Sequence, residues 1–155
     1  MTTIQDKFHG VFSLALIDLA FIIAIYSIAL QSIAMAGLFT LLIIVGFGIV
    51  IYSFCTKCSS NKDCGHVLLG PIAQKMPKKE IGNYKTKHYL GALVPILILV
   101  AIPQYWIWQS LWSGISFWAL FAIAGSEVNK FVCTKCNNRA CALCKKDIFK
   151  EAKCK

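Results

Sequence analysis

Two long apolar stretches dominate the pattern of hydrophobic and polar positions along the chain, and each contains a short polar turn. Between residues 8 and 54 the only Asp, Glu, Lys or Arg is Asp18, and residues 88–126 contain none of these four. Uncharged stretches of that length cannot form the surface of a water-soluble protein. The pattern therefore predicts an all-α integral membrane protein with four transmembrane helices.

Each predicted span has roughly the twenty residues that a helix needs to cross a bilayer. The spans are expected at about 11–30, 33–54, 89–108 and 111–128 of a single membrane domain, 1–155, with a loop at 55–88 and a tail at 129–155. The first apolar region is expected to remain as a span rather than be cleaved as a signal peptide, because it is too long and contains Asp18.

The charged residues indicate which way the spans face. The formal net charge is +9, and all sixteen Lys and Arg residues lie at the N-terminus, in the loop 55–88 or after residue 126. The connections near 31–33 and 108–111 carry none. This is the pattern of positive residues on the cytoplasmic side. It places both termini in the cytoplasm, predicts a protein of the inner membrane that meets anionic lipid headgroups, and disfavours nucleic acid as a partner.

The chain also contains an internal repeat. The tetrapeptide Cys-Thr-Lys-Cys occurs at 55–58 and again at 133–136, a shift of 78 residues. When the sequence is aligned with itself at this shift, the first predicted span matches the third, and the second matches the fourth. The sequence therefore predicts two parallel-repeat hairpins that deliver two short Cys-rich segments to the same cytoplasmic face.

The two Cys-rich segments have the spacing of metal sites. The first is C-x2-C-x5-C-x-H and the second is C-x2-C-x4-C-x2-C. A C-x2-C turn directs two thiolates at one ion, and a reducing compartment disfavours stable disulfides. The predicted ligands are Cys55, Cys58, Cys64, His66, Cys133, Cys136, Cys141 and Cys144.

The grouping of these ligands and the metal remain open from the sequence. Each segment could bind its own ion, or the two Cys-Thr-Lys-Cys turns could form one site and the other four ligands a second. We expect sites within each segment. Zinc is the expected metal because tetrahedral Cys₄ and Cys₃His sets suit it. An iron–sulfur cluster is the alternative, although the bacterial C-x2-C-x2-C run is absent.

Three other ionisable residues lie in or next to the spans. Asp18 within the first span could serve an ion pathway, but a protonated or hydrogen-bonded carboxyl that holds helices together is expected, since no span contains a basic partner. His9 and His88 stand near the starts of the first and third spans. They could ligate haem or metal, but a position at the headgroup level is expected.

These features predict a small membrane protein whose cytoplasmic thiolate sites order short segments, acting as a non-enzymatic subunit or adaptor beside other membrane subunits. Two alternatives stay open: an iron–sulfur electron-transfer protein, and a thiol redox enzyme or metal-handling transporter. No Ser-His-Asp set, phosphate-binding glycine loop or pair of catalytic carboxylates is evident in the sequence.

Overall fold

The computed structural model of the chain describes residues 4–58, 68–77 and 84–133. Every regular element within these ranges is helical, which confirms the predicted all-α class. In chain order the elements are α1 (Ile4–Ala29), α2 (Ile33–Ser53), the 3₁₀ turn η1 (Cys55–Lys57), α3 (Leu69–Lys75), α4 (Thr86–Ala101), α5 (Gln104–Ile107), α6 (Leu111–Glu127) and the π-helical segment η2 (Val128–Val132).

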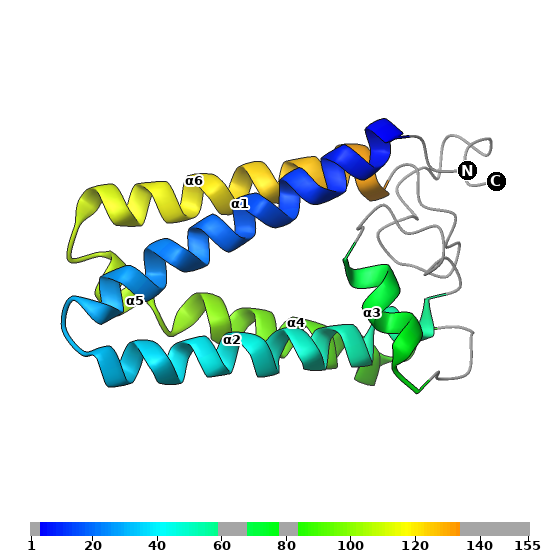
Figure 1. The fold of residues 1–155 in the computed structure, drawn as a ribbon, viewed down its shortest axis with the longest axis horizontal. Helices are drawn as coiled ribbons and strands as arrows, with labels where there is room; N and C mark the ends of the chain where they lie inside the picture. The colour runs from blue at the N-terminus through cyan, green and yellow to red at the C-terminus, as the bar shows by residue number, and fades with distance from the viewer. Residues whose placement is uncertain (1–3, 59–67, 78–83, 134–155) are drawn as a thin grey trace.

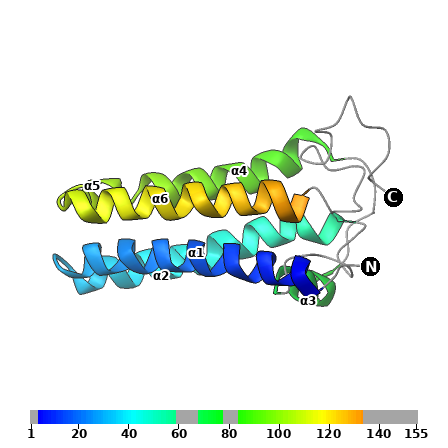
Figure 2. The same cartoon turned by 90° about the horizontal axis from the view of Figure 1, so that it is seen from above.

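The four long helices run lengthwise together, with α1 antiparallel to α2 and α4 antiparallel to α6 (Figures 1 and 2). We call the two successive pairs the hairpins α1–α2 and α4–α6. The most extensive contacts join the hairpins, α1 against α6 and α2 against α4, and α1 also packs against α2. We call the end with the connections 30–32 and 102–110 the turn end, and the end with 54–58 and 128–133 the cysteine end.

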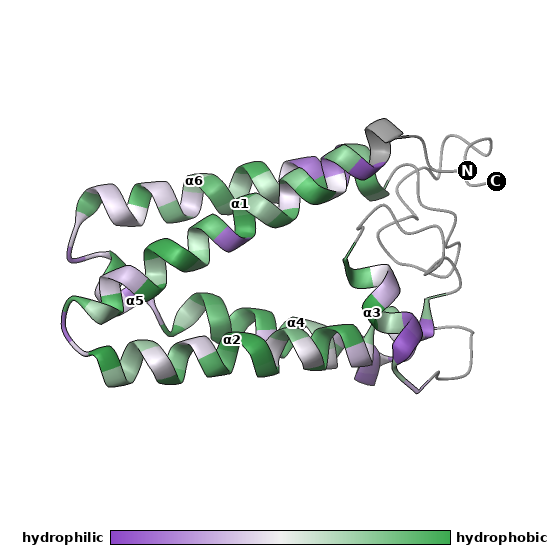
Figure 3. Ribbon diagram, in the orientation of Figure 1, coloured by the Kyte–Doolittle hydropathy of each residue, from purple (hydrophilic) through white to green (hydrophobic). Residues whose placement is uncertain are grey.

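The outer surface of this bundle is apolar. Bulky residues such as Ile22, Leu38, Leu97 and Ile115 are exposed along the four long helices. Figure 3 shows hydrophobic residues predominating along these helices, with hydrophilic ones gathered near α3 and the start of α1. Four helical stretches are long and apolar enough to cross a membrane: Lys7–Ala29, Ile33–Lys57, Thr86–Ile107 and Leu111–Val132. Because soluble monomers rarely expose so continuous an apolar surface, the bundle has the character of a membrane protein.

The interior is built around phenylalanine rings from three of the long helices. Phe117 of α6 is completely buried, and its ring lies 4.8 Å from that of Phe121. Phe21 of α1 meets Phe121 edge-on at 5.6 Å and lies 6.4 Å from Phe39 of α2. Such edge-on and tilted pairs are favourable beyond their buried area, so these rings hold the two hairpins together.

The third predicted span differs from the structure because a proline ends its helix early. α4 passes through Pro95 but stops at Ala101, and Pro103 begins the separate short helix α5. Proline has no N–H to continue the helical hydrogen-bond pattern. Gln104 compensates: its Nε2 donates to the carbonyl oxygen of Val100 at 2.5 Å, and its Oε1 accepts from the indole of Trp118 at 3.2 Å.

The other span boundaries differ less. α2 begins at the predicted residue, whereas α1 begins before the predicted start at Val11 and α6 continues past Glu127 as a π-helical segment. The prolines of the loop 55–88 argue against one regular helix across it. The structure has the short helix α3 in this loop, with Pro71 in its first turn, where proline is tolerated, and α3 ends before Pro77.

Candidate metal centre

The first Cys-Thr-Lys-Cys motif forms a tight turn directly after α2. The backbone N–H of Cys58 donates to the carbonyl oxygen of Cys55 at 3.1 Å, which closes the turn. The 3₁₀ turn ends at Lys57, and the backbone of Cys58 is extended. Both cysteines are partly exposed, and neither forms a disulfide in the structure. The turn brings the backbones of the two cysteines close together, as the binding of one ion by both thiolates of a C-x2-C pair requires.

Buried neighbours fix this turn to the bundle. Thr56 is almost completely buried, and its hydroxyl donates to the carbonyl oxygen of Tyr52 at 2.7 Å. The ring of Phe54 stacks on that of Tyr84 at 4.6 Å, and the Tyr84 hydroxyl donates to the Phe54 carbonyl oxygen at 3.3 Å. The Thr between the two cysteines therefore anchors the motif, while Cys55 and Cys58 remain partly exposed.

A second support comes from α3, which packs against both η1 and the end of α2. Gly70 and Ala73 are buried at this contact, whereas Leu68 and Ile72 are exposed. A helix with small residues inward and apolar residues outward fits a position at the membrane surface. α3 thus covers one side of the first cysteine turn.

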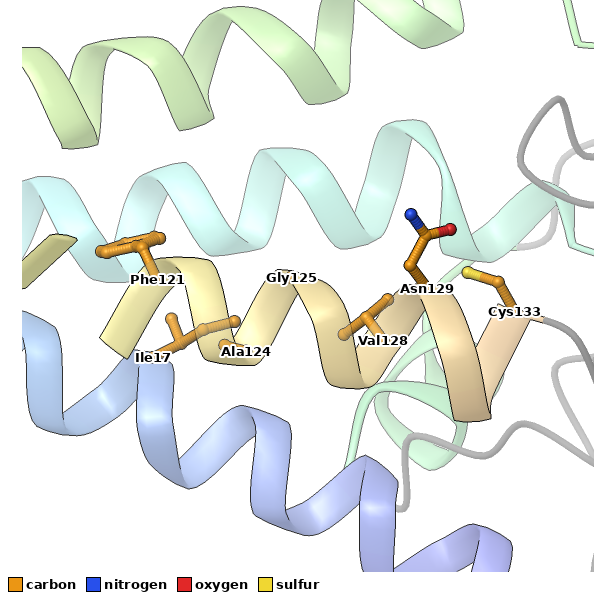
Figure 4. A pocket seen from close by; sticks show the side chains of 7 residues that line it. All are labelled: Ile17, Phe121, Ala124, Gly125, Val128, Asn129 and Cys133. Carbon is orange, nitrogen blue, oxygen red and sulfur yellow. The ribbon is translucent and has the colours of Figure 1, made fainter. Parts of the chain in front are cut away.

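The second motif begins where the π-helical segment ends. The backbone N–H of Cys133 donates to the carbonyl oxygen of Val128, five residues back, so η2 is wider than an α-helix. Cys133 is partly exposed, and Figure 4 shows its side chain at the end of η2, near Asn129. π-helical turns occur frequently at functional sites. In this chain the π-helical turn lies immediately before the second group of predicted ligands.

An interaction between α1 and α6 holds η2 in place. The Nδ1 of His9 lies 2.8 Å from Oε2 of Glu127, and both side chains are about four-fifths buried. The His9 ring also stacks on Phe131 at 4.1 Å, with the ring planes 6° from parallel. Together these contacts fix both ends of η2 to α1. The sequence did not reveal this role, because the pair lies 118 residues apart.

His88 and Asp18 have different surroundings. The backbone N–H of Lys85 donates to Nδ1 of His88 at 3.0 Å, so the buried imidazole caps the start of α4. Asp18 is exposed on α1 within the first span. The expectation that its carboxyl holds helices together receives no support from this outward position.

Only three of the eight predicted ligands, Cys55, Cys58 and Cys133, fall within the described residues. Cys64, His66, Cys136, Cys141 and Cys144 lie outside them, and so do the sites that they would complete. Within 4–58, 68–77 and 84–133, no three His, Cys, Asp or Glu side chains come together as a metal-binding group. The three described cysteines all lie at the cysteine end, after two helices that run in the same direction (Figure 1).

One polar pair at the turn end was missed in the sequence. Gln31 Nε2 donates to Gln109 Oε1, and the two residues are 78 positions apart, the same shift that relates the cysteine motifs. Each glutamine is followed by a serine that precedes a long helix, Ser32 before α2 and Ser110 before α6. Comparing the two turns at this shift would have revealed a second matching pair of motifs.

The arrangement brings soft sulfur ligands to one end of an apolar bundle, and the cysteine turn η1 is fixed by buried contacts. Thiolates so placed can bind Zn²⁺ or an iron–sulfur cluster, or can undergo thiol–disulfide exchange. Comparisons of the chain with protein-family models, with curated proteins and with solved structures find no match.

Proposed function

We propose that the protein is a small polytopic membrane subunit or adaptor whose two cytoplasmic Cys-rich segments bind zinc through thiolates. One observation carries the proposal. The two helices that precede the Cys-Thr-Lys-Cys motifs, α2 and α6 with η2, end at the same end of the bundle (Figure 2). Four thiols carried by two identical tetrapeptides that follow these helices would form a metal site more readily than they would serve packing.

The helix contacts support two hairpins related by an axis along the membrane normal. Exchanging the hairpins converts the α1–α6 contact into the α4–α2 contact, and these are the two most extensive contacts of the bundle. Equivalent residues can touch each other only at such an axis, as Gln31 and Gln109 do. The same exchange relates the buried rings of Phe39 and Phe117. In this proposal the repeat is what delivers both cysteine motifs to one depth.

The charge distribution supports a cytoplasmic orientation of the cysteine end. The described lysines, Lys7, Lys57, Lys75, Lys85, Lys87 and Lys130, flank the helix ends there. The connections at the turn end carry no Lys or Arg but contain Trp106 and Trp108, and Trp112 follows at the start of α6. Positive residues inside and tryptophans at the interface are the usual signs of this orientation.

Asp18 favours a role within a larger complex. A carboxyl exposed on the outer face of a membrane helix is costly in lipid, and the lysines of the four candidate spans lie near the cysteine end of the helices rather than beside Asp18. A neighbouring subunit that covers this face would remove the cost. For this reason we favour a subunit or adaptor over a self-contained enzyme.

Elemental analysis of the full-length protein, purified anaerobically under reducing conditions, tests the proposal. We expect about two zinc ions per chain, because eight ligands satisfy two four-coordinate sites, and a colourless protein. A brown protein with iron and acid-labile sulfide would replace the zinc adaptor with an electron-transfer protein. A metal-free protein whose thiols cycle between oxidised and reduced forms would overturn metal binding and favour a thiol enzyme.

A further inference from the structure

Asp18 lies at the middle of the first candidate span, on the outside of the bundle. That span runs from Lys7 to Ala29, so Asp18 is its central residue. Asp18 is exposed, and its carboxyl forms no hydrogen bond or ion pair with any residue that the structure describes. Acids at that depth in membrane proteins usually face other protein and pair with a basic group, because an isolated carboxyl is costly in hydrocarbon. Contact with protein rather than lipid is therefore expected on this side of α1.

The exposed residues of α1 include a stripe that has Asp18 near its middle. Its members follow one another at intervals of three or four, and we call them the α1 stripe: Phe8, Val11, Ala15, Asp18, Ile22 and Tyr26. Residues at these intervals share one side of a helix, and the same spacing forms the seam between packed membrane helices. Ala15 lies one turn from Asp18, and its small side chain allows another helix to approach the carboxyl closely.

The matching positions of α4 lack both of these features. At the shift of 78 residues that relates the two Cys-Thr-Lys-Cys motifs, Ala15 corresponds to Leu93 and Asp18 to Ile96. Leu93 and Ile96 are both exposed, and large aliphatic side chains are suited to contact with lipid. At the same two positions α1 has a small residue and an acid. The requirement for a protein neighbour is therefore specific to the first hairpin.

A second copy of this chain does not supply a base at the right depth. Copies inserted in the same direction would bring Asp18 against Asp18 in a symmetric contact. Lys7 stands eleven residues from Asp18, which is about 16 Å along the helix at about 1.5 Å per residue. The other lysines of the candidate spans, Lys57, Lys87 and Lys130, also lie near the cysteine end. A cation beside Asp18 must come from a different protein.

We propose that the α1 stripe packs against a transmembrane helix of another protein, and that a lysine or arginine in the middle of that helix pairs with Asp18. The proposal rests on the proposed function as a membrane subunit, but it does not depend on zinc. It assigns Asp18 the role of selecting the partner and Ala15 the role of allowing close approach. Pairing removes the cost that each charged group would have in lipid, so the contact discriminates against helices without a base at this depth.

Binding of synthetic membrane-spanning peptides to the full-length protein in phosphatidylcholine vesicles tests the proposal. The peptides are leucine–alanine helices without tryptophan, with identical ends and a terminal dansyl group, and they carry either lysine or leucine at the central position. Energy transfer from the tryptophans of the protein to the dansyl group measures binding as the peptide-to-lipid ratio rises. We expect saturable transfer with the lysine peptide, at an apparent dissociation constant about tenfold below that of the leucine peptide.

Variants of the α1 stripe show whether the peptide binds there. Asp18→Asn keeps the size of the side chain but removes the ionisable group, so it should abolish the preference for the lysine peptide, whereas Asp18→Glu should retain it. Ala15→Leu introduces the residue found at position 93 and should weaken binding of the lysine peptide about tenfold by blocking close approach. Ala101→Leu adds the same bulk at an exposed position of α4 and should leave binding unchanged.

Equal binding of the two peptides, or a lysine preference that survives Asp18→Asn, would overturn the proposal. Self-association of the protein that Asp18→Asn abolishes, measured by counting subunits through stepwise photobleaching, would also overturn it, because a second copy would then cover the stripe. Zinc is measured in the same preparation to keep the two proposals apart. Absence of the lysine preference in zinc-loaded protein overturns only the helix contact, and a lysine preference in metal-free protein overturns only the zinc sites.

Discussion

Replacing Cys133 by serine is expected to release one of the two proposed zinc ions while the protein still inserts into the membrane. A serine hydroxyl is not deprotonated at neutral pH and is a poor zinc ligand, so a site that loses one of four thiolates loses its ion. The four candidate spans do not depend on this residue, which lies after the last of them. Elemental analysis of the purified variant measures the loss, from about two ions per chain to about one.

Cys154 supplies a matched control, because it lies outside the predicted ligand set. Cys154→Ser removes a thiol from the same tail and should retain all the metal. Full retention of metal by Cys133→Ser would contradict the assignment of Cys133 as a ligand. Equal loss of metal from both variants would contradict the exclusion of Cys154 from the ligand set.

A double variant separates the two possible groupings of ligands. If each segment binds its own ion, Cys55→Ser combined with Cys133→Ser removes both ions. If the two Cys-Thr-Lys-Cys turns form one shared site, the same pair removes only one. Elemental analysis of this double variant therefore distinguishes the two groupings: loss of both ions indicates separate sites, and loss of one ion indicates a shared site.

Gly91→Ala is expected to destabilise the bundle by forcing apart α2 and α4. Among the glycines of these two helices, its replacement by alanine should have the largest effect. A Cβ atom at position 91 would lie 2.6 Å from Oγ of Ser53 and 2.9 Å from its Cβ. The hydroxyl can rotate away, but the Ser53 Cβ is fixed to the backbone of α2, so the helices must separate. Overpacking of this kind costs about 1–3 kcal/mol, measurable as the free energy of unfolding in mixed micelles.

The control is Gly48→Ala on α2, where an added Cβ meets nothing within 4 Å. This change should be neutral or stabilise the helix by up to about 1 kcal/mol, because alanine is the better helix former. Gly46→Ala should fall between the two, since its neighbour at 2.9 Å is the flexible end of Leu99. Equal stability of Gly91→Ala and Gly48→Ala would contradict close packing of α2 on α4.

Much of the fold follows from the apolar pattern, because a bilayer imposes both length and hydrophobicity on a span. The four spans and the start of α2 at Ile33 were predictable for this reason. The break in the helix at Pro103 was harder to predict, because prolines are tolerated in membrane helices. Pro95, for example, lies within α4 and does not end it. The π-helical segment η2 contacts α1, a helix that is distant in the sequence, so the local sequence alone does not predict it.

The candidate site was predictable only in part. Identical tetrapeptides at 55 and 133 predicted that both motifs lie at one end of the bundle, and the structure describes Cys55, Cys58 and Cys133 at that end. The pairing of His9 with Glu127 required knowledge of which helices are neighbours, because the residues belong to the first and last spans. The pocket that Ile17 of α1 lines together with Phe121 and Gly125 of α6 was also hidden, because it depends on the packing of two helices that are distant in the sequence.

The side of the membrane on which the cysteines lie is the most direct test of the account. Two forms of the protein would be compared, one retaining Cys58 and the other Cys133 as its only cysteine, each treated with a membrane-impermeant maleimide in right-side-out and in inverted membrane vesicles. The account predicts that both cysteines react in inverted vesicles and that neither reacts in right-side-out vesicles. Reaction of the two from opposite sides, or of either from the outer side, would contradict it.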